Sequence, residues 1–247
     1  MELKILGSSS AGNCYIFDNG KEALVVECGI RFMDVKKAVN FDVSRIVGCL
    51  VSHEHGDHAK EVQKVIDARI PVYMSTGTAK SLDLDNKNRL LATMVDCGIY
   101  HIGGFTVQAF NTQHDCAEPF GFLIHHHEMG MVLFATDTYY LAYTFKGLNN
   151  ILIECNYRLD ILEENIATGR VPEVTRDRTI KSHMSFDTCK ETLLANDLST
   201  MNNIVLIHLS GGNSNAMEFQ QGIQEATGKT VHIADKGMTL KFNKTPF

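Results

Sequence analysis

His53-Glu54-His55-Gly56-Asp57-His58 follows directly after an apolar segment, residues 45–52, that is predicted to be a strand. In extended backbone, residues i and i+2 point to the same side, so His53 and His55 can bind one divalent ion while Asp57 and His58 turn toward a second. Three imidazoles and a carboxylate this close together are costly to desolvate without a cation between them. The alternative is a solvated loop that is rich in histidine by chance, and the metal-ligand spacing argues against it. The stretch therefore predicts a site for two metal ions at a strand end.

This H-x-H-x-D-H pattern after a strand resembles the second motif of the metallo-β-lactamase superfamily. The resemblance implies an α/β fold, the four-layer αβ/βα sandwich, with one or two metal ions at the edge between its two sheets. It also implies further ligands downstream, and His114, Asp137 and His208 follow or end the predicted strands 105–110, 131–136 and 203–207. By this resemblance one metal is held by His53, His55 and His114, the other by Asp57, His58 and His208, and Asp137 bridges both.

Four shorter segments are similar to the YycJ-type (WalJ-like) subgroup of this superfamily, which is regarded as a group of DNA exonucleases. They are Gly-Ser-Ser-Ser-Ala-Gly-Asn-Cys at 7–14, Ile-Glu-Cys-Asn-Tyr at 153–157, Ser-His-Met-Ser at 182–185 and His-Leu-Ser-Gly-Gly-Asn at 208–213. The likeness spans nearly the whole chain in the right order. One residue departs from the superfamily pattern: Glu27 ends a predicted strand where Asp is usual, which leaves open whether that carboxylate reaches the histidine loop.

The resemblance implies phosphodiester hydrolysis, and most directly a metal-dependent DNA nuclease of the exonuclease type with a link to DNA repair. Two divalent cations, Zn or Mn, would lower the pKa of a shared water and stabilise the attacking and leaving oxygens at phosphorus. Asp57 is placed to orient that water, and His183 is expected to donate a proton to the leaving oxygen or to bind a non-bridging one. Nitrogen-rich ligation suits zinc whereas many nucleases use manganese, and the sequence does not choose between them.

A second group of residues is expected to contact the substrate. The small residues of the 8–13 loop could offer backbone N–H groups to a phosphate, although a tight turn between two strands needs the same residue types. Residues 169–181 carry four cations against two carboxylates and lead into His183, so they are either a contact for a phosphate backbone or an ordinary solvated connector. The expected substrate contacts are Ser8, Ser9, Ser10, Asn13, Asn156, Arg176, Arg178 and Asn213.

The composition sets further bounds. With 247 residues, 44% of them hydrophobic, the chain can bury a substantial core, and we expect a single domain over residues 1–247. The lack of a basic-then-apolar leader and of an apolar stretch of membrane length favours a cytoplasmic protein with no membrane partner. The seven cysteines are scattered and odd in number, as expected for reduced thiols, and Cys116 is expected to be a packing or loop thiol rather than a ligand.

Three functions from different classes stay open. The first is a nuclease whose partner is a nucleic acid, DNA before RNA; a net charge of -6 argues against it only in part, because bound cations offset carboxylates at the site. The second is a small-molecule hydrolase acting on a cyclic nucleotide, lactone or thioester. The third, a non-catalytic binding module, is disfavoured by the intact ligand set. A long basic groove would favour the polymer substrate and a closed pocket with an aromatic clamp the small one. Cleavage polarity and oligomeric state stay undetermined.

The periodicity of apolar residues predicts short strands alternating with helices. Besides the strands that precede the ligands, the predicted strands are 2–6, 13–17, 23–27, 46–51, 72–74, 94–96, 101–107, 122–124, 131–135, 231–233 and 238–242, and the predicted helices are 32–40, 60–68, 160–167, 186–196 and 216–226. His125, His126 and His127 are expected in the solvent-exposed turn of a hairpin rather than at the metals.

Overall fold

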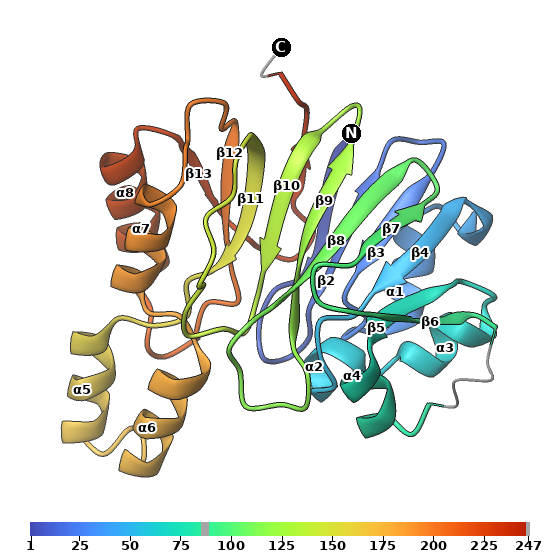
Figure 1. Ribbon diagram of the computed structural model, residues 1–247. Coiled ribbons are helices and arrows are strands. Elements are labelled where there is room, and N and C mark those ends of the chain that lie inside the picture. Colours follow the sequence, from blue (N-terminus) through green and yellow to red (C-terminus); the bar gives the residue numbers. More distant parts are fainter. Residues whose placement is uncertain (85–88, 246–247) are drawn as a thin grey trace.

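Two seven-stranded sheets form the centre of the computed structural model, which describes residues 1–84 and 89–245 (Figure 1). The first sheet has the order β14 (Thr239–Lys241), β1 (Glu2–Gly7), β2 (Cys14–Asp18), β3 (Ala23–Val26), β4 (Ile46–Leu50), β5 (Val72–Ser75), β6 (Leu91–Met94). The second sheet has the order β13 (Thr230–Ile233), β12 (Asn203–Ile207), β11 (Leu148–Glu154), β10 (Gly130–Ala135), β9 (Phe120–His126), β8 (Phe105–Asn111), β7 (Ile99–Ile102).

Helices cover the outer faces of both sheets (Figure 1). The first sheet carries α1 (Phe32–Ala38), α3 (Val62–Asp67) and α4 (Thr76–Ser81), with the short η1 (Val43–Arg45) and α2 (Gly56–Ala59) on either side of β4. The second sheet carries α7 (Phe186–Leu194) and α8 (Ala216–Thr227). α5 (Leu159–Ala167) and α6 (Glu173–Ser182) form a pair at the same end of the molecule as α2.

Three apolar clusters hold these layers together. The cluster between the sheets includes the fully buried rings of Phe17, Phe105, Phe122 and Phe134, so it joins β2 to β8, β9 and β10. A second cluster packs α1 and α3 on the first sheet, and a third packs α7 and α8 on the second. The order helix, sheet, sheet, helix confirms the predicted four-layer αβ/βα sandwich.

Strand direction brings several loops to one edge of the sandwich. β10, β11 and β12 are parallel, and β8 runs in the direction of β10 because each pairs antiparallel with β9. The C-terminal ends of these four strands therefore lie at the same edge of the second sheet. The loop after β4 and α2 lie at this end of the molecule as well (Figure 1), so the topology gathers the predicted ligand-bearing segments.

Some predicted elements differ from the structure. The predicted strand 101–107 is a hairpin, because Gly103 adopts a left-handed φ of 57° and turns β7 into β8. The predicted strand 94–96 lies instead at Leu91–Met94. Neither α4 nor α6 was predicted as a helix. For α6 the reason is its charged sequence, which has little apolar periodicity. The basic stretch 169–181 is thus largely helical, rather than a plain connector.

The histidine triplet corrects one expectation. His125 and His127 are exposed as predicted, but His126 is fully buried at the end of β9. Its ring lies against Phe105 with centroids 4.8 Å apart, and its Nε2 lies 3.3 Å from Glu22 Oε1. The strand extends two residues further than predicted, to His126, so the alternation of side chains points His126 into the sandwich.

All seven cysteines are free thiols, in agreement with the prediction of reduced cysteines. Cys116 is partly buried, and burial together with the Glu54 carboxylate raises its pKa to about 12. The thiol is therefore protonated at neutral pH, as expected for a packing or loop cysteine. Within residues 1–84 and 89–245, no helix has both the length and the apolar character needed to cross a membrane.

Candidate metal centre

Backbone hydrogen bonds fix the histidine loop after β4 to two neighbouring loops. The Asn13 N–H donates to the Asp57 carbonyl oxygen, and the Cys28 N–H donates to the His58 carbonyl oxygen, both at 2.8 Å. α2 begins at Gly56, so Asp57 and His58 lie in one helical turn that folds back over the strand ends. Contacts with these two loops therefore fix the backbone from which four predicted ligands project.

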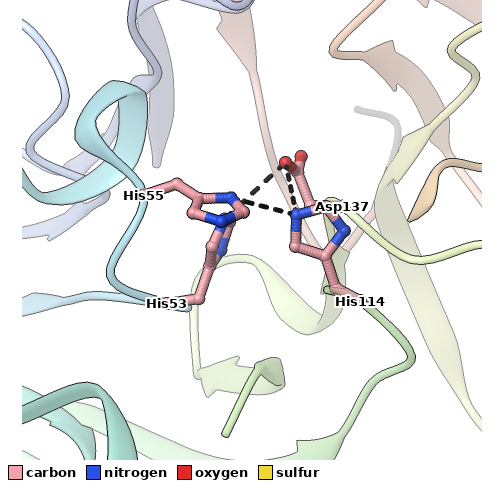
Figure 2. Close-up of side chains that lie close together, drawn as sticks. All are labelled: His53, His55, His114 and Asp137. Atoms are coloured by element: carbon pink, nitrogen blue, oxygen red, sulfur yellow. Dashed lines mark hydrogen bonds and ion pairs between the residues drawn. The ribbon is translucent and has the colours of Figure 1, made fainter. Parts of the chain in front are cut away.

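Four side chains form the first half of the centre (Figure 2). His53 and His55 come from the loop after β4, His114 from the loop after β8 and Asp137 from the end of β10. His55 Nδ1 lies 3.1 Å from His114 Nε2, and Asp137 Oδ2 lies 3.5 Å from His114 Nε2 and 3.7 Å from His53 Nε2. Their ligand atoms lie within 4.8 Å of one another.

Asp57, His58 and His208 form the second half around the same Asp137 carboxylate. His58 Nε2 lies 3.4 Å from both Asp57 Oδ2 and Asp137 Oδ2. His208 follows β12, and its Nε2 lies 3.4 Å from Asp57 Oδ2 while its Nδ1 lies 3.2 Å from Asp137 Oδ1. The structure thus brings all seven predicted ligands into two groups that share Asp137.

The donor atoms of both groups fit divalent cations. A tetrahedral ion with bonds of about 2.0–2.1 Å separates its ligand atoms by about 3.4 Å, which is close to the 3.1–3.7 Å between the pairs of atoms given above. His53 Nε2 is buried and has no hydrogen-bond partner within the described part of the chain. Such an atom is costly unless something completes its bonding, and an ion does so. Imidazole and carboxylate donors suit zinc and also manganese.

The far ring nitrogens of two ligands are held in a way typical of metal sites. His114 Nδ1 lies 2.8 Å from the Ser182 carbonyl oxygen at the end of α6, to which its N–H can donate a hydrogen bond. His53 Nδ1 lies 2.8 Å from Ser52 Oγ. Contacts of this kind fix the ring orientation and direct the Nε2 atom toward the cation.

Glu27 reaches the histidine loop, although Asp is usual at this position. Its Oε2 lies 3.3 Å from His58 Nδ1, and its Oε1 accepts a hydrogen bond from the Ser52 N–H at 3.2 Å. The backbone of Glu27 has a left-handed φ of 68°, and Asp137 and His208 have φ values of 42° and 54°. Non-glycine residues in this region cost roughly 1–3 kcal/mol each, and such strain is concentrated at functional sites.

Glu154 is a site residue whose role was not predicted, although it lies in the segment 153–157 that resembles the YycJ-type subgroup. It ends β11, is fully buried, and accepts hydrogen bonds from the Thr138 and Met184 N–H groups through Oε2. Its Oε1 lies 2.7 Å from His183 Nδ1 and 3.2 Å from His208 Nδ1. The available signal in the sequence was a lone carboxylate directly after the apolar run 151–153.

His183 belongs to neither group of predicted ligands, although it forms a third cluster of possible ligand atoms with Asp137, Glu154 and His208. Its ring stacks on His208 with centroids 5.4 Å apart and meets His114 edge-on at 5.3 Å. Its side chain is 22% exposed, so one face is open to solvent. Ser185 caps α7: its side chain accepts a hydrogen bond from the Thr188 N–H and thereby fixes the segment that carries His183.

Without a cation, protons balance the carboxylates of the centre. Burial lowers the pKa of His58, but Asp137 and Glu27 outweigh it and hold that pKa well above the usual value. Burial likewise opposes protonation of His208, yet Asp137 and Asp57 raise its pKa to about 10. Burial lowers the pKa of His53, so this ring is neutral and ready to donate a lone pair. Metal binding must displace the protons from His58 and His208, so the affinity for metal should fall as the pH falls.

Two predicted substrate contacts prove to be buried beside the ligands. Asn13 is fully buried, and its Nδ2 lies 3.3 Å from Asp57 Oδ2 and 3.1 Å from His58 Nε2. Asn156 is 6% exposed and donates from Nδ2 to the His208 carbonyl oxygen at 2.8 Å. Both side chains are almost fully covered, and their hydrogen bonds hold the loops that carry the predicted ligands.

The remaining loop residues also differ in exposure. Ser8 accepts hydrogen bonds through Oγ from Tyr15 Oη and from the His208 N–H, so it supports a ligand. Ser9 is partly buried and Ser10 is exposed, which keeps both available for contact with a phosphate. Asn213 is 8% exposed and accepts a hydrogen bond from Asn165 Nδ2, which ties its loop to α5.

The two predicted arginines lie on different sides of α6. Arg176 pairs with Glu163 of α5 at 2.5 Å, so its charge is used within the helix pair. Arg178 is 70% exposed and pairs at 3.1 Å with Asp115, whose other oxygen lies 3.3 Å from His114 Nε2. Arg178 therefore lies next to the ligand groups, and Arg176 does not.

Gly29→Ala should reduce metal affinity roughly 10- to 100-fold, the range for losing the support of a ligand. A Cβ at Gly29 would overlap the Asp57 carbonyl oxygen, so the backbone that carries Asp57 and His58 must shift. Gly56→Ala is the matched control, because Gly56 lies in the histidine loop and a Cβ there meets nothing within 4 Å. Competition titration against a chelator measures both variants; equal affinities would contradict this account of the loop.

Comparison with known proteins confirms the fold. Residues 9–82, which include the histidine loop, match the family model described as the metallo-β-lactamase superfamily. The crystal structure of the metallo-β-lactamase fold protein YhfI from Bacillus subtilis superposes with a TM-score of 0.75 at 16% identity, covering 97% of this chain and 98% of that one. The chain therefore has the metallo-β-lactamase fold, and it carries His and Asp clusters that could hold a divalent metal at the edge of its sheets.

Two curated relatives extend the likeness over most of the chain. The exodeoxyribonuclease YycJ of Bacillus anthracis is 25% identical over 185 residues, which are 70% of this chain and 67% of the relative. The exodeoxyribonuclease WalJ of Streptococcus pneumoniae serotype 2 (strain D39) is 24% identical over 227 residues, 85% of this chain and 82% of the relative. This confirms the resemblance to the YycJ-type subgroup.

Proposed function

We propose that the protein is a binuclear metallo-hydrolase that cleaves phosphodiester bonds and removes nucleotides from an end of DNA. The observation that carries the proposal is the sharing of Asp137 between two groups of ligand atoms, because a pair of adjacent cations suits displacement at phosphorus. The likeness to relatives named exodeoxyribonucleases over most of the chain supports DNA as the substrate. The single chain of 247 residues is proposed to act as one domain.

The roles of the chain's own residues follow from burial and exposure. Seven side chains hold the two divalent ions, Zn or Mn, which when bound acidify water and stabilise charge on phosphoryl oxygens. Asp57 is the more exposed of the two proposed carboxylate ligands: 22% of its side chain is exposed, against 3% for Asp137. Asp57 can therefore accept a hydrogen bond from the attacking water and orient it, while Asp137 holds the two groups together.

His183 is the proposed group that meets the leaving oxygen. Its Nδ1 faces Glu154 at 2.7 Å, which leaves Nε2 to face the substrate. Glu154 fixes the imidazole in the manner of a buried carboxylate that orients a catalytic histidine. Because Glu154 also contacts His208, the orientation of His183 is tied to the ligand groups without His183 having to be a ligand.

Arg178→Glu should weaken DNA binding and reduce the slope of log affinity against log salt by about 1, since one phosphate contact is lost. The Arg178 guanidinium is exposed next to the centre, where it can contact a phosphate. Arg176→Glu should have a smaller effect on DNA binding, because Arg176 is less exposed and pairs with Glu163. Lys37→Glu on α1, at 62% exposure, is the charge-matched control on the other layer. Fluorescence anisotropy over a salt series measures the three variants, and identical slopes would remove Arg178 from the interface.

Incubation with end-labelled substrates tests the function itself. The protein, loaded with Zn or Mn, should release nucleotides from single- or double-stranded DNA, and a chelator should abolish the release. RNA and cyclic nucleotides are assayed in parallel, since the same metal chemistry serves them. Rapid turnover of a cyclic nucleotide with no cleavage of DNA or RNA would overturn the nuclease in favour of a small-molecule phosphodiesterase.

A further inference from the structure

The segment that follows Asp137 exposes tyrosines beside the metal centre. Tyr139 and Tyr140 are 42% and 54% exposed, although large aromatic side chains are usually covered. Thr138 anchors the segment: its N–H donates to Glu154 Oε2, and its Oγ accepts from the Gln113 N–H, next to His114. The tyrosines are therefore carried by backbone that is bonded to the site.

The same segment lines one wall of a cavity of about 330 Å³. Tyr140 and Tyr143 lie on this wall, and Thr188, Glu191 and Thr192 of α7 lie opposite. The volume is at the lower end of the roughly 300–1,000 Å³ typical of small-molecule sites. The lining begins three residues after Asp137 on one side and five residues after His183 on the other, so both walls follow closely in the chain on residues of the centre.

The two tyrosines of the cavity wall are held differently. Tyr143 packs edge-on against Phe110 with centroids 5.9 Å apart, and it also lies 6.3 Å from Phe145. Tyr140 makes no aromatic contact and no side-chain hydrogen bond among the described residues, and only its carbonyl oxygen accepts a bond, from Thr138. Tyr143 is thus part of a supported floor, whereas the Tyr140 ring is free to receive a planar group.

We infer that this cavity, here called the tyrosine cleft, takes the unpaired nucleobase next to the scissile phosphate, with the base stacked on Tyr140. The inference rests on the proposed function and names its substrate as a strand end with an unstacked base. Bases of any sequence stack on aromatic side chains. Glu191 in the opposite wall would repel a phosphate but can accept a hydrogen bond from an exocyclic amine, so the cleft suits a base rather than the backbone.

A cycle of enzyme and substrate changes tests the stacking. Tyr140→Leu removes the ring, Tyr140→Phe keeps it, and the DNA strand carries either a normal or an abasic terminal nucleotide. Loss of the stack should lower kcat/KM roughly 5- to 100-fold for Tyr140→Leu on the normal end, while Tyr140→Phe stays near wild type. On the abasic end all three enzymes should be equal, because the ring then has no base to contact. An unchanged Tyr140→Leu enzyme, or equal losses on both ends, would overturn the proposal.

A binding measurement separates this proposal from the nuclease assignment. 2-Aminopurine at the terminal position of a phosphorothioate strand reports stacking without cleavage. The chain has no tryptophan whose fluorescence would add to this signal. Wild type and Tyr140→Phe should quench its fluorescence, and Tyr140→Leu should not. Phe41→Leu, which alters a ring that is 63% exposed after α1, should behave like wild type. Cleavage of DNA without Tyr140-dependent quenching would overturn the tyrosine cleft alone, and quenching without cleavage would overturn the nuclease alone.

Discussion

Asp137→Ala should empty both metal positions and lower kcat/KM by more than about 10³-fold, because one carboxylate is common to both groups of ligand atoms. Its Oδ2 lies 3.4–3.7 Å from nitrogen atoms of His58, His114 and His53, and removing it leaves these imidazoles with no shared anion. Metal analysis of the purified variant, together with its rate on DNA, measures the effect. Wild type should hold about two divalent ions per chain when saturated.

His55→Ala provides the comparison within the same centre. This residue belongs to the first group only, so its loss should reduce the metal content from about two ions per chain toward one, with a loss of activity. Asp137→Ala should lose more metal than His55→Ala in the same preparation series. A fully loaded and active Asp137→Ala enzyme would contradict a binuclear centre built on that carboxylate.

His183→Ala should lower kcat by roughly 10²- to 10⁴-fold, the range for a proton donor, while both metals stay bound and the thermal midpoint barely moves. The ring lies against His114 and His208 but is outside the proposed seven-ligand set, and its exposed face points away from the core. Metal content, thermal midpoint and single-turnover rate on one preparation measure the three effects together.

His232→Ala is the matched histidine control, since this partly buried ring lies on β13 and contacts Asn203. It should keep the wild-type kcat. If His183 served only to pack the fold, its replacement would instead lower the thermal midpoint and leave the rate of the folded enzyme intact. Wild-type rates in His183→Ala would remove it from the reaction.

The fold could be predicted, and four of the seven proposed ligands were found in the sequence, because they lie one to three residues after a short apolar strand. His53, His114, Asp137 and His208 all occupy such positions, and parallel strands bring their C-terminal ends to one edge. The alternation of strands and helices was readable for the same reason. α6 was missed because its charged sequence lacks an apolar stripe, so its helical form depends on its contact with α5.

The contacts around the ligands could not be predicted, because they depend on tertiary packing. Asn13 looked like a substrate residue in a small-residue loop, but the approach of Asp57 buries it completely. Glu154 is separated from His183 by 29 positions and from His208 by 54, so no local pattern shows that it contacts both. Whether Glu27 reaches His58 depended on its backbone angle, which a sequence pattern does not define.

Anomalous diffraction from crystals of the protein grown with Mn or Zn tests the central claim most directly. The account predicts two peaks, one among His53, His55, His114 and Asp137 and the other among Asp57, His58, His208 and Asp137. A single peak, or peaks away from Asp137, would contradict the binuclear centre from which the proposed phosphodiesterase is derived.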